Sequence, residues 1–271
     1  MSEPREPAMP ESDAATSVEI PAITTDEMAQ VDRIMADEYG VTSLQLMELA
    51  GHAVATYARQ HFCHGDVNGK RILALCGGGG NGGDAMVAVR LLHAWGAHPQ
   101  VFLTRDAGDI VGDAAHQLAT LRAFDIPIEE PESPTTSDSR NPTYETTPTL
   151  LPESDLILDG LLGFGGHGAP KGRAAELIRA TNAAGAQILA IDIPSGLDAT
   201  TGDLGTPCIR AKVTLTLGLP KRGLREATAR TAAGRIVVAD IGIPPQVYER
   251  IGKHIPTGIF SRGSFREWSP T

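Results

Sequence analysis

The sequence is poor in cysteine and aromatic residues, and it contains no long hydrophobic run. Its three cysteines, Cys63, Cys76 and Cys208, form no Cys-x-x-Cys pair and cannot all be bridged, which favours a reducing cytoplasm. No apolar run approaches the roughly 20 residues that a membrane-spanning helix needs. The N-terminus also lacks the apolar segment of a secretory signal. We therefore expect a cytoplasmic protein with no membrane partner.

Positive charge is also scarce. The chain carries 23 lysine and arginine residues against 33 aspartate and glutamate residues, a formal net charge of −10. Such a surface repels phosphates, so we expect no nucleic-acid partner. What the sequence has in quantity is glycine, with 30 residues, together with 41% hydrophobic residues. This composition is typical of a soluble α/β protein with a real core and many tight turns.

The length allows one large domain or two small ones. Residues 1–18 are rich in Pro, Ser and Glu and predict a disordered tail. We expect a single domain over residues 19–250, because strand and helix signals alternate along it. Residues 131–149 are polar, rich in Pro and Thr and without periodicity, so we interpret them as a surface loop insertion. Residues 251–271 are a C-terminal extension whose role the sequence does not reveal.

Alternating helix and strand signals predict the fold. Capping boxes begin at Thr24 and Thr42, so two helices should precede the first strand. Short apolar runs then follow, of the kind found in buried parallel strands. The predicted strands are residues 72–76, 99–103, 156–159, 188–192, 213–217 and 236–239, and the later helices are residues 84–95, 114–124 and 174–184. This alternation predicts βαβ units and a mostly parallel, doubly wound sheet.

Three glycine-rich or acidic segments come directly after predicted strands. Ligands bind outside the carboxyl ends of the strands in doubly wound sheets, so segments 77–84, 159–170 and 192–198 predict a common site. The first, GGGGNGGD, lets the backbone approach a ligand and offers helix N-terminal N–H groups to a phosphate. No Gly-Lys-Ser/Thr follows, so it is not a Walker A loop. The plain alternative is a strand-to-helix turn in which Asp84 caps the helix.

Acidic residues end two of the predicted strands. Asp159 and Asp192 are these residues, and the turn after Asp192 presents Ser195. Ser195 is not in a Gly-x-Ser-x-Gly sequence, so a cation ligand or a hydrogen-bond donor to substrate suits it better than a nucleophile. His167 has a pKa near neutrality, but an exposed loop histidine is the more ordinary interpretation.

Several motifs together resemble one family, the YjeF N-terminal domain proteins. The motifs are NGGD at 81–84, the loop after Asp159, DIPSG at 192–196 and GLPK at 218–221, with LMELAG before them and ADIGIP after them. The resemblance covers about residues 22–245 and implies a Rossmann-like three-layer α/β/α sandwich with a mostly parallel sheet. The family usually has Asn where this chain has Gly80, and Gly where it has Ala85.

The resemblance implies an NAD(P)H-hydrate epimerase. Such an enzyme interconverts the R and S forms of NADHX and NADPHX, which are hydrated nicotinamide cofactors. A separate dehydratase then restores the S form; this chain is too short to include one, so we expect it on another protein. A homodimer also fits the resemblance. Carried over by position, the ligands of a K+ ion are Asn81, Asp159 and Ser195. The substrate contacts carried over are Gly80, Asn81, Gly82, Gly83, Asp84, Gly163, Phe164, Gly165, Gly166, His167, Gly168, Ala169 and Asp192.

Epimerisation chemistry suggests a role for Asp192. The ring nitrogen can expel the C6 hydroxyl and leave a cyclic iminium ion, to which water can return on either face. The reaction needs an acid, a base and negative charge near the iminium. Asp192 is therefore the predicted catalytic residue. Asp159 is expected to hold the cation, and Lys221 either helps to neutralise phosphate or lies on the surface.

Three other functions stay open. A non-catalytic nucleotide-binding or scaffold domain of the same fold is disfavoured by the acidic charge and by the presence of Asp159 and Asp192. An NAD(P)-dependent oxidoreductase could use the glycine segment as a dinucleotide fingerprint. That fingerprint needs an acidic residue at the end of the second strand, and the nearby candidate, Asp106, lies somewhat beyond that position. A metabolite kinase would need ATP and Mg²⁺ residues that we do not find. The sequence shows no preference between NADHX and NADPHX.

Overall fold

The computed structural model describes residues 19–131, 150–165 and 168–269. The predicted tail at 1–18, nearly all of the predicted insertion at 131–149 and two predicted substrate contacts, Gly166 and His167, lie outside the described residues. All three cysteines are free thiols. No described helix is long and apolar enough to cross a membrane.

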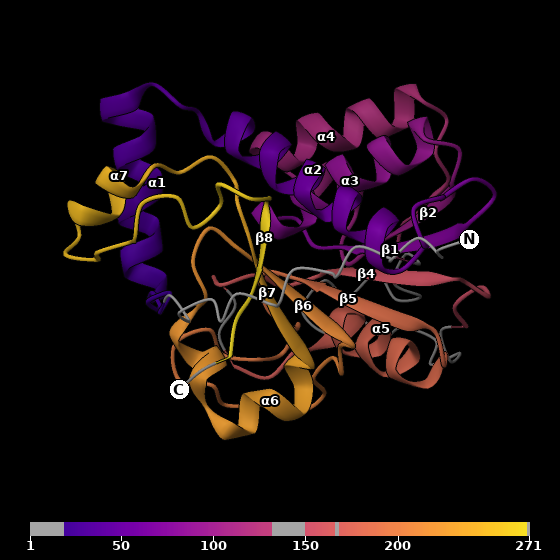
Figure 1. The fold of residues 1–271 in the computed structure, drawn as a ribbon. Helices are drawn as coiled ribbons and strands as arrows, with labels where there is room; N and C mark the ends of the chain where they lie inside the picture. The colour runs from indigo at the N-terminus through magenta and orange to yellow at the C-terminus, as the bar shows by residue number, and fades with distance from the viewer. Residues whose placement is uncertain (1–18, 132–149, 166–167, 270–271) are drawn as a thin grey trace, which may run out of the picture.

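An eight-stranded sheet forms the centre of the molecule (Figure 1). Its order is β3-β2-β1-β4-β5-β6-β7-β8, and every neighbouring pair is parallel except β7 and β8. The strands are β1 (Arg71–Cys76), β2 (His98–Leu103), β3 (Ile128–Glu129), β4 (Leu156–Gly160), β5 (Gln187–Ile191), β6 (Val213–Leu217), β7 (Arg235–Ala239) and β8 (Phe265–Glu267). The strand order reverses between β1 and β4, and such a switch point is where these sheets bind ligands.

Helices cover both faces of the sheet, which confirms the predicted three-layer α/β/α sandwich. The helices are α1 (Thr25–Tyr39), α2 (Ser43–His61), α3 (Gly80–Ala94), α4 (Gly112–Ala123), α5 (Gly172–Ala183), α6 (Ala227–Ala233) and α7 (Pro245–Glu249). In Figure 1, α2, α3 and α4 lie on one face of the sheet, and α5 and α6 lie on the other. α1 lies beside α7 at one end of the molecule instead of covering the sheet.

Local sequence decides where α1 and α2 begin. The Thr24 hydroxyl accepts a hydrogen bond from the Glu27 N–H at 3.2 Å, and the Glu27 carboxylate accepts one from the Thr24 N–H at 2.8 Å. Thr42 and Gln45 repeat the arrangement at the start of α2. Each box satisfies backbone N–H groups that a helix start leaves without partners. Both predicted capping boxes are therefore confirmed.

α3 begins at Gly80, earlier than the predicted start at residue 84. Its N-cap is Gly79, so the interpretation of Asp84 as a helix cap is wrong. The glycines allow this early start because backbone packs on backbone: a Cβ on Gly82 would lie 2.0 Å from the carbonyl oxygen of Gly77. The predicted glycine loop is thus largely the first turn of a helix.

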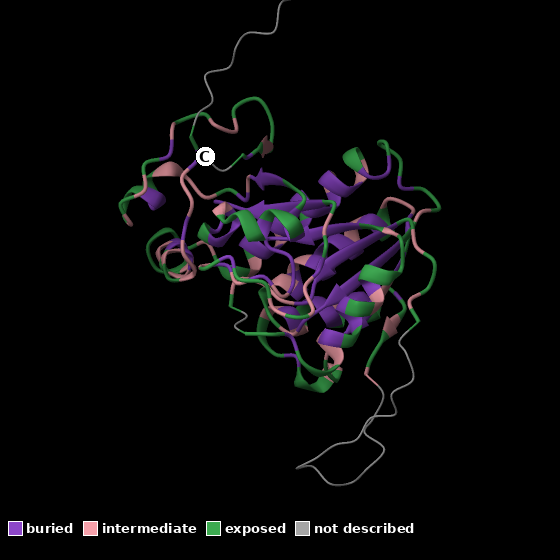
Figure 2. Ribbon diagram, turned by 90° about the horizontal axis from the view of Figure 1, so that it is seen from below, coloured by how far each residue is buried: buried purple, intermediate pink, exposed green. Residues whose placement is uncertain are grey.

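The central strands are buried on both faces. Every residue of β4 and β6 is buried, and in β1 only the first residue is exposed. Figure 2 shows these buried strands enclosed by helices with exposed outer faces. The double cover explains why the strands are continuous apolar runs in the sequence. A carboxylate inside such a strand, as Asp159 is in β4, must find its partners within the protein.

Candidate active site

A cavity of about 560 Å³ opens at the carboxyl ends of the parallel strands. Its walls come from α1, α2, the first turn of α3 and the segments that follow β1, β2, β4, β5, β6 and β7. Gly79 and Gly80 line it, and a Cβ on either residue would meet nothing within 4 Å. The three segments singled out in the sequence meet here, as their positions after neighbouring strands imply.

Asp159 lies beneath the cavity with Ser195 as its main partner. Both residues are fully buried, Asp159 in β4 and Ser195 just after β5. The Ser195 hydroxyl donates to Oδ1 of Asp159 at 2.6 Å, and the Ser195 N–H donates to Oδ2 at 2.8 Å. Burial raises the pKa of Asp159 to about 6, although these hydrogen bonds act to lower it. Within the described part of the chain, no lysine or arginine pairs with this carboxylate.

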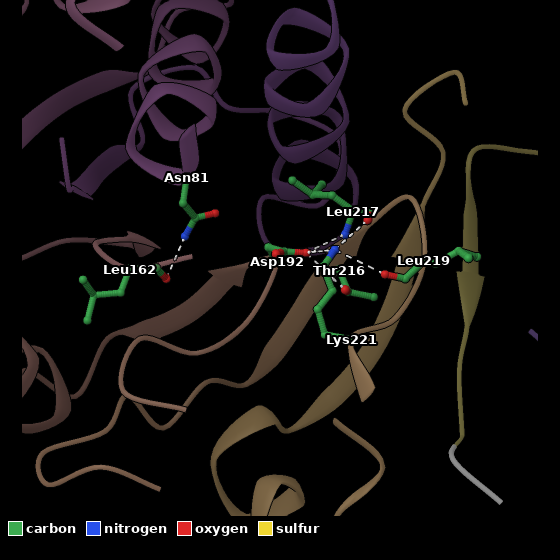
Figure 3. Close-up of polar contacts among 7 residues, drawn as sticks. All are labelled: Asn81, Leu162, Asp192, Thr216, Leu217, Leu219 and Lys221. Atoms are coloured by element: carbon green, nitrogen blue, oxygen red, sulfur yellow. Dashed lines mark hydrogen bonds and ion pairs between the residues drawn. The ribbon is translucent and has the colours of Figure 1, made fainter. Parts of the chain in front are cut away.

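Asn81 adds a second oxygen-rich side chain next to Ser195. The Asn81 Nδ2 donates to the carbonyl oxygen of Leu162 at 3.1 Å (Figure 3). The Ser195 hydroxyl accepts from the Leu162 N–H at 2.9 Å, so Leu162 connects the two side chains. The Oδ1 of Asn81 is buried and has no hydrogen-bond partner among the residues that the structure describes. An orphaned buried acceptor of this kind needs an explanation, and a bound cation is one.

The donor atoms of this cluster are all hard oxygens. They are a carboxylate, an amide oxygen, a hydroxyl and a backbone carbonyl, from Asp159, Asn81, Ser195 and Leu162. Across the described ranges, no group of three or more His, Cys, Asp and Glu residues could hold a metal ion. With only one carboxylate, the cluster suits a weakly charged cation that accepts neutral oxygen ligands.

Asp192 lies in the cavity wall and faces a buried lysine. Its Oδ1 lies 2.5 Å from Nζ of Lys221, whose side chain is 1% exposed (Figure 3). The Thr216 hydroxyl and the Leu217 N–H also donate to this oxygen, at 3.3 and 3.2 Å. The backbone of Asp192 has φ +66°, in the left-handed region that Asp and Asn tolerate better than most residues. All three contacts are made to Oδ1 of Asp192.

Lys221 is buried, and its ammonium group already has several partners. Besides Asp192, its ammonium donates to the carbonyl oxygens of Leu217 at 2.9 Å and Leu219 at 3.3 Å. Three partners use all three of its N–H groups. The interpretation of Lys221 as a surface lysine is therefore wrong, because the turn after β6 folds the side chain back beneath Asp192. Its predicted help in neutralising phosphate stays a prediction.

Two further carboxyl groups, Asp84 and Asp32, line the same cavity. Burial raises the pKa of Asp84 well above its ordinary value, and the negative charge of Asp192 adds to the effect. The pKa of Asp32 is raised in the same way, mainly by burial. α1 brings Asp32 here because the Ile23 N–H donates to the Pro220 carbonyl at 2.8 Å, which holds the start of α1 against the segment before Lys221.

Most of the predicted substrate contacts line this cavity. Those that do are Gly80, Asn81, Gly82, Asp84, Gly163, Phe164, Gly165 and Asp192. Gly168 and Ala169 line a neighbouring cavity of about 270 Å³, which Gly163 also borders. Gly83 lies behind the wall, where a Cβ would come within 2.4 Å of Cε of Met47. Asp159 and Ser195 lie below the floor, and Gly166 and His167 lie outside the described residues.

Sequence reasoning missed two charged residues of the cavity, Asp32 and Arg105. Asp32 had a usable signal: it follows the buried Met28 by four residues, so it is a carboxylate on the apolar face of α1. Arg105 had a weaker one, since it comes just after β2, at the carboxyl edge of the sheet.

Comparisons with known proteins agree with the fold and the motifs. A family model described as YjeF-related protein N-terminus matches residues 43–223. The NAD(P)H-hydrate epimerase of Dehalogenimonas lykanthroporepellens is 36% identical over 233 residues, which cover 86% of this chain and 86% of that protein. The bifunctional NAD(P)H-hydrate repair enzyme Nnr of Moorella thermoacetica is 38% identical over 227 residues, which cover 83% of this chain. This chain spans only 41% of the length of that bifunctional relative.

Among solved structures, the crystal structure of yeast YNL200c has a similar fold. The TM-score is 0.72, and the match covers 92% of this chain and 100% of the yeast chain. The sequence identity is 23%, so this likeness supports the architecture alone. It agrees with the mostly parallel sheet covered on both faces.

Proposed function

This chain belongs to the family of YjeF-related protein N-termini, and on that premise we propose that it is an NAD(P)H-hydrate epimerase, an isomerase that interconverts the R and S forms of NADHX and NADPHX. One observation carries the proposal. Asp84 and Asp192 line one cavity in opposite electrostatic settings, since burial favours the neutral form of Asp84 while Asp192 faces an ammonium group. Two carboxyl groups in such different settings provide an acid and a base.

Asp84 is the proposed acid. Burial raises its pKa and so favours the protonated carboxyl group. As the lone pair of the ring nitrogen forms the C=N bond and the C6–O bond breaks, Asp84 gives its proton to the leaving hydroxyl, which departs as water. The products of this step are a cyclic iminium ion, a water molecule and the Asp84 carboxylate.

Asp192 is the proposed base and the source of negative charge near the iminium ion. When water adds to C6 on the other face, Asp192 accepts the proton that this water loses. Lys221 is a positioning residue, because it holds Oδ1 of Asp192 and leaves Oδ2 for the substrate. Turnover in the reverse direction, or proton exchange with solvent, returns both carboxyl groups to their starting states.

The diphosphate of the substrate fits the first turn of α3. The N–H groups of Gly80, Asn81 and Gly82 belong to this turn and have no partner within the helix. A helix N-terminus attracts anions through such groups. Gly163 and Gly165, in the loop after β4, also line the cavity, and a Cβ on Gly163 would lie 3.0 Å from Cβ of Asn81. The nicotinamide end would then lie toward Asp192.

Potassium is the proposed cofactor, with Asn81, Asp159 and Ser195 as its ligands. The fit rests on the orphaned Oδ1 of Asn81 and on the single, unpaired carboxylate of Asp159. When bound, the ion supplies positive charge below the diphosphate turn. These three residues also connect β4, the turn after β5 and α3, so they keep the phosphate-binding turn in place.

The relatives named bifunctional repair enzymes suggest a metabolic partner. We propose that a dehydratase acts on the S form that this epimerase makes. The predicted homodimer and the predicted cytoplasmic location stay predictions.

The decisive assay uses purified protein and R-NADPHX in potassium buffer, with the R and S forms separated by chromatography. We expect interconversion faster than in buffer without protein, and an Asp84→Asn variant should slow it by about 10² to 10⁴-fold. Asp37→Asn, an exposed change on α1, is the matched control and should act like the wild type. Folded protein that does not accelerate the reaction would indicate a binding domain instead of an enzyme.

A further inference from the structure

The cavity contains one positive side chain that the proposed mechanism does not use. Among the lining residues that the structure describes, the cationic ones are Arg105 and Lys221. Lys221 has all three N–H groups engaged with Asp192 and two backbone carbonyls. Arg105 is exposed, and it forms no ion pair or hydrogen bond with any described residue. Its guanidinium is therefore the side-chain cation available to an anionic ligand.

Arg105 lies over the glycine turn. It follows β2, the strand next to β1 on the side away from β4. A Cβ on Gly78 would lie 2.8 Å from both Cδ and Nε of Arg105, so the absence of a side chain on Gly78 is what lets the arginine reach the cavity wall. The guanidinium thus lies beside the phosphate-binding turn.

The order of the strands places the parts of a dinucleotide along the cavity. Under the proposed function, the reacting ring lies near Asp192, which follows β5, and the diphosphate lies at the turn after β1 and the loop after β4. In the sheet order β2-β1-β4-β5, the next position beyond the diphosphate is the end of β2. The adenosine half of the substrate therefore extends toward Arg105. In sheets of this topology the segment after the second strand contacts the adenosine ribose.

We propose that Arg105 binds the phosphate on the 2′-oxygen of the adenosine ribose, so that the enzyme prefers hydrated NADPH to hydrated NADH. This inference rests on the proposed function. A preference for hydrated NADH would require a carboxylate that accepts a hydrogen bond from the free 2′-hydroxyl of the adenosine ribose. The acid in this segment, Asp106, is exposed and is not part of the cavity lining, whereas Arg105 is. Guanidinium also matches phosphate with paired hydrogen bonds.

A binding experiment tests the inference without using epimerase activity. We would titrate wild type, Arg105→Gln and Arg179→Gln with adenosine 2′,5′-bisphosphate and with 5′-AMP, using calorimetry. Arg179 is an exposed arginine on α5 that does not line the cavity, so it is a matched control. Wild type and Arg179→Gln should bind the bisphosphate at least about 10-fold more tightly than 5′-AMP. In Arg105→Gln this difference should disappear.

The catalytic counterpart is the ratio of kcat/KM for NADPHX to kcat/KM for NADHX. Arg105→Gln should lower this ratio by about 10 to 100-fold, and Arg105→Lys should lower it less because lysine keeps the charge but not the paired geometry. If kcat/KM fell equally for both substrates, so that the ratio was unchanged, Arg105 would contact the diphosphate instead, and the inference would be overturned. An unchanged preference for the bisphosphate in the variant would also overturn it. If the wild type bound the bisphosphate selectively but had no epimerase activity, the proposed function would be refuted. The binding of the 2′-phosphate by Arg105 would still be supported.

Discussion

Asp159 and Asp192 occupy similar positions and meet opposite environments. Each lies at the carboxyl end of a parallel strand, in β4 and just after β5, and each is at least 96% buried. Asp159 receives hydrogen bonds from Ser195, which is neutral. Asp192 lies 2.5 Å from the ammonium of Lys221. One buried carboxylate is thus left without a counter-charge, and its neighbour has one.

The difference indicates two uses for buried negative charge. A buried carboxylate with only neutral partners has an uncompensated negative charge, which a bound cation can neutralise. A carboxylate with a built-in ammonium keeps its position and charge without a ligand. This difference supports the proposal that the Asp159 region binds the cation and that the Asp192 region transfers protons. The two regions should respond differently to substitution, pH and potassium.

The largest expected effect is on catalysis in the Asp192 region. Asp192→Asn should lower kcat/KM for epimerisation by about 10² to 10⁴-fold, because it removes the base and the charge near the iminium ion. Asparagine is the suitable replacement, since it tolerates the positive φ of this position. Chromatographic rates for R-NADPHX, alongside circular dichroism to confirm folding, are the measurement. Near-normal rates from folded variant would remove Asp192 from the mechanism.

The next effect is on stability, and it separates the two aspartates. Asp192→Asn leaves the Lys221 charge buried and unpaired, which should lower the free energy of unfolding by about 3–5 kcal/mol. Asp159→Asn removes no ion pair and should cost less than about 1 kcal/mol without potassium. Urea unfolding would measure both. In the double variant Asp192→Asn/Lys221→Met, stability should be restored but activity should not. If the two single variants lowered the free energy of unfolding equally, the proposed difference between Asp159 and Asp192 would be contradicted.

A smaller effect is the pH dependence of stability in potassium-free buffer. Burial raises the pKa of Asp159 from 3.8 to about 6, so between these values the folded state binds a proton that the unfolded state has lost. This contribution is complete below pH 3.8 and is lost as the pH rises through about 6. It amounts to about 3 kcal/mol. Unfolding of the wild type and Asp159→Asn between pH 4 and 7 should show the difference, and parallel pH curves would show that Asp159 does not titrate in this way.

The smallest effect is stabilisation by potassium. At about 100 times its Kd, potassium should add about 2.7 kcal/mol to the free energy of unfolding, which raises Tm by several degrees. Asn81→Ala removes the orphaned oxygen and should reduce the shift. Asp37→Asn should leave it unchanged. A Tm that rises equally in Asn81→Ala would mean that the ion binds elsewhere.

Sequence reasoning recovered the fold because its signals are local. The short apolar runs matched every parallel strand except the two-residue β3, and the capping boxes at Thr24 and Thr42 matched two helix starts. It misplaced the start of α3, because a run of glycines predicts a loop. Only the structure shows that Gly82 packs against the Gly77 carbonyl in the first turn of the helix. Of the candidate site, it found the strand-end residues and missed Asp32 and Arg105, which come from elements outside the glycine and acidic motifs.

What the sequence determined by itself is where each strand ends and which polar residue follows it. In a parallel sheet those ends share one edge, so Asn81, Asp159 and Asp192 had to come near one another. What only the tertiary structure decided is the environment of each group. Lys221 pairs with Asp192 because the turn after β6 folds back, and Asp32 reaches the cavity because α1 is fastened to that same segment. Charge pairing and burial depend on contacts between distant residues, and those contacts distinguish the carboxylate that we propose binds a cation from the one that we propose transfers a proton.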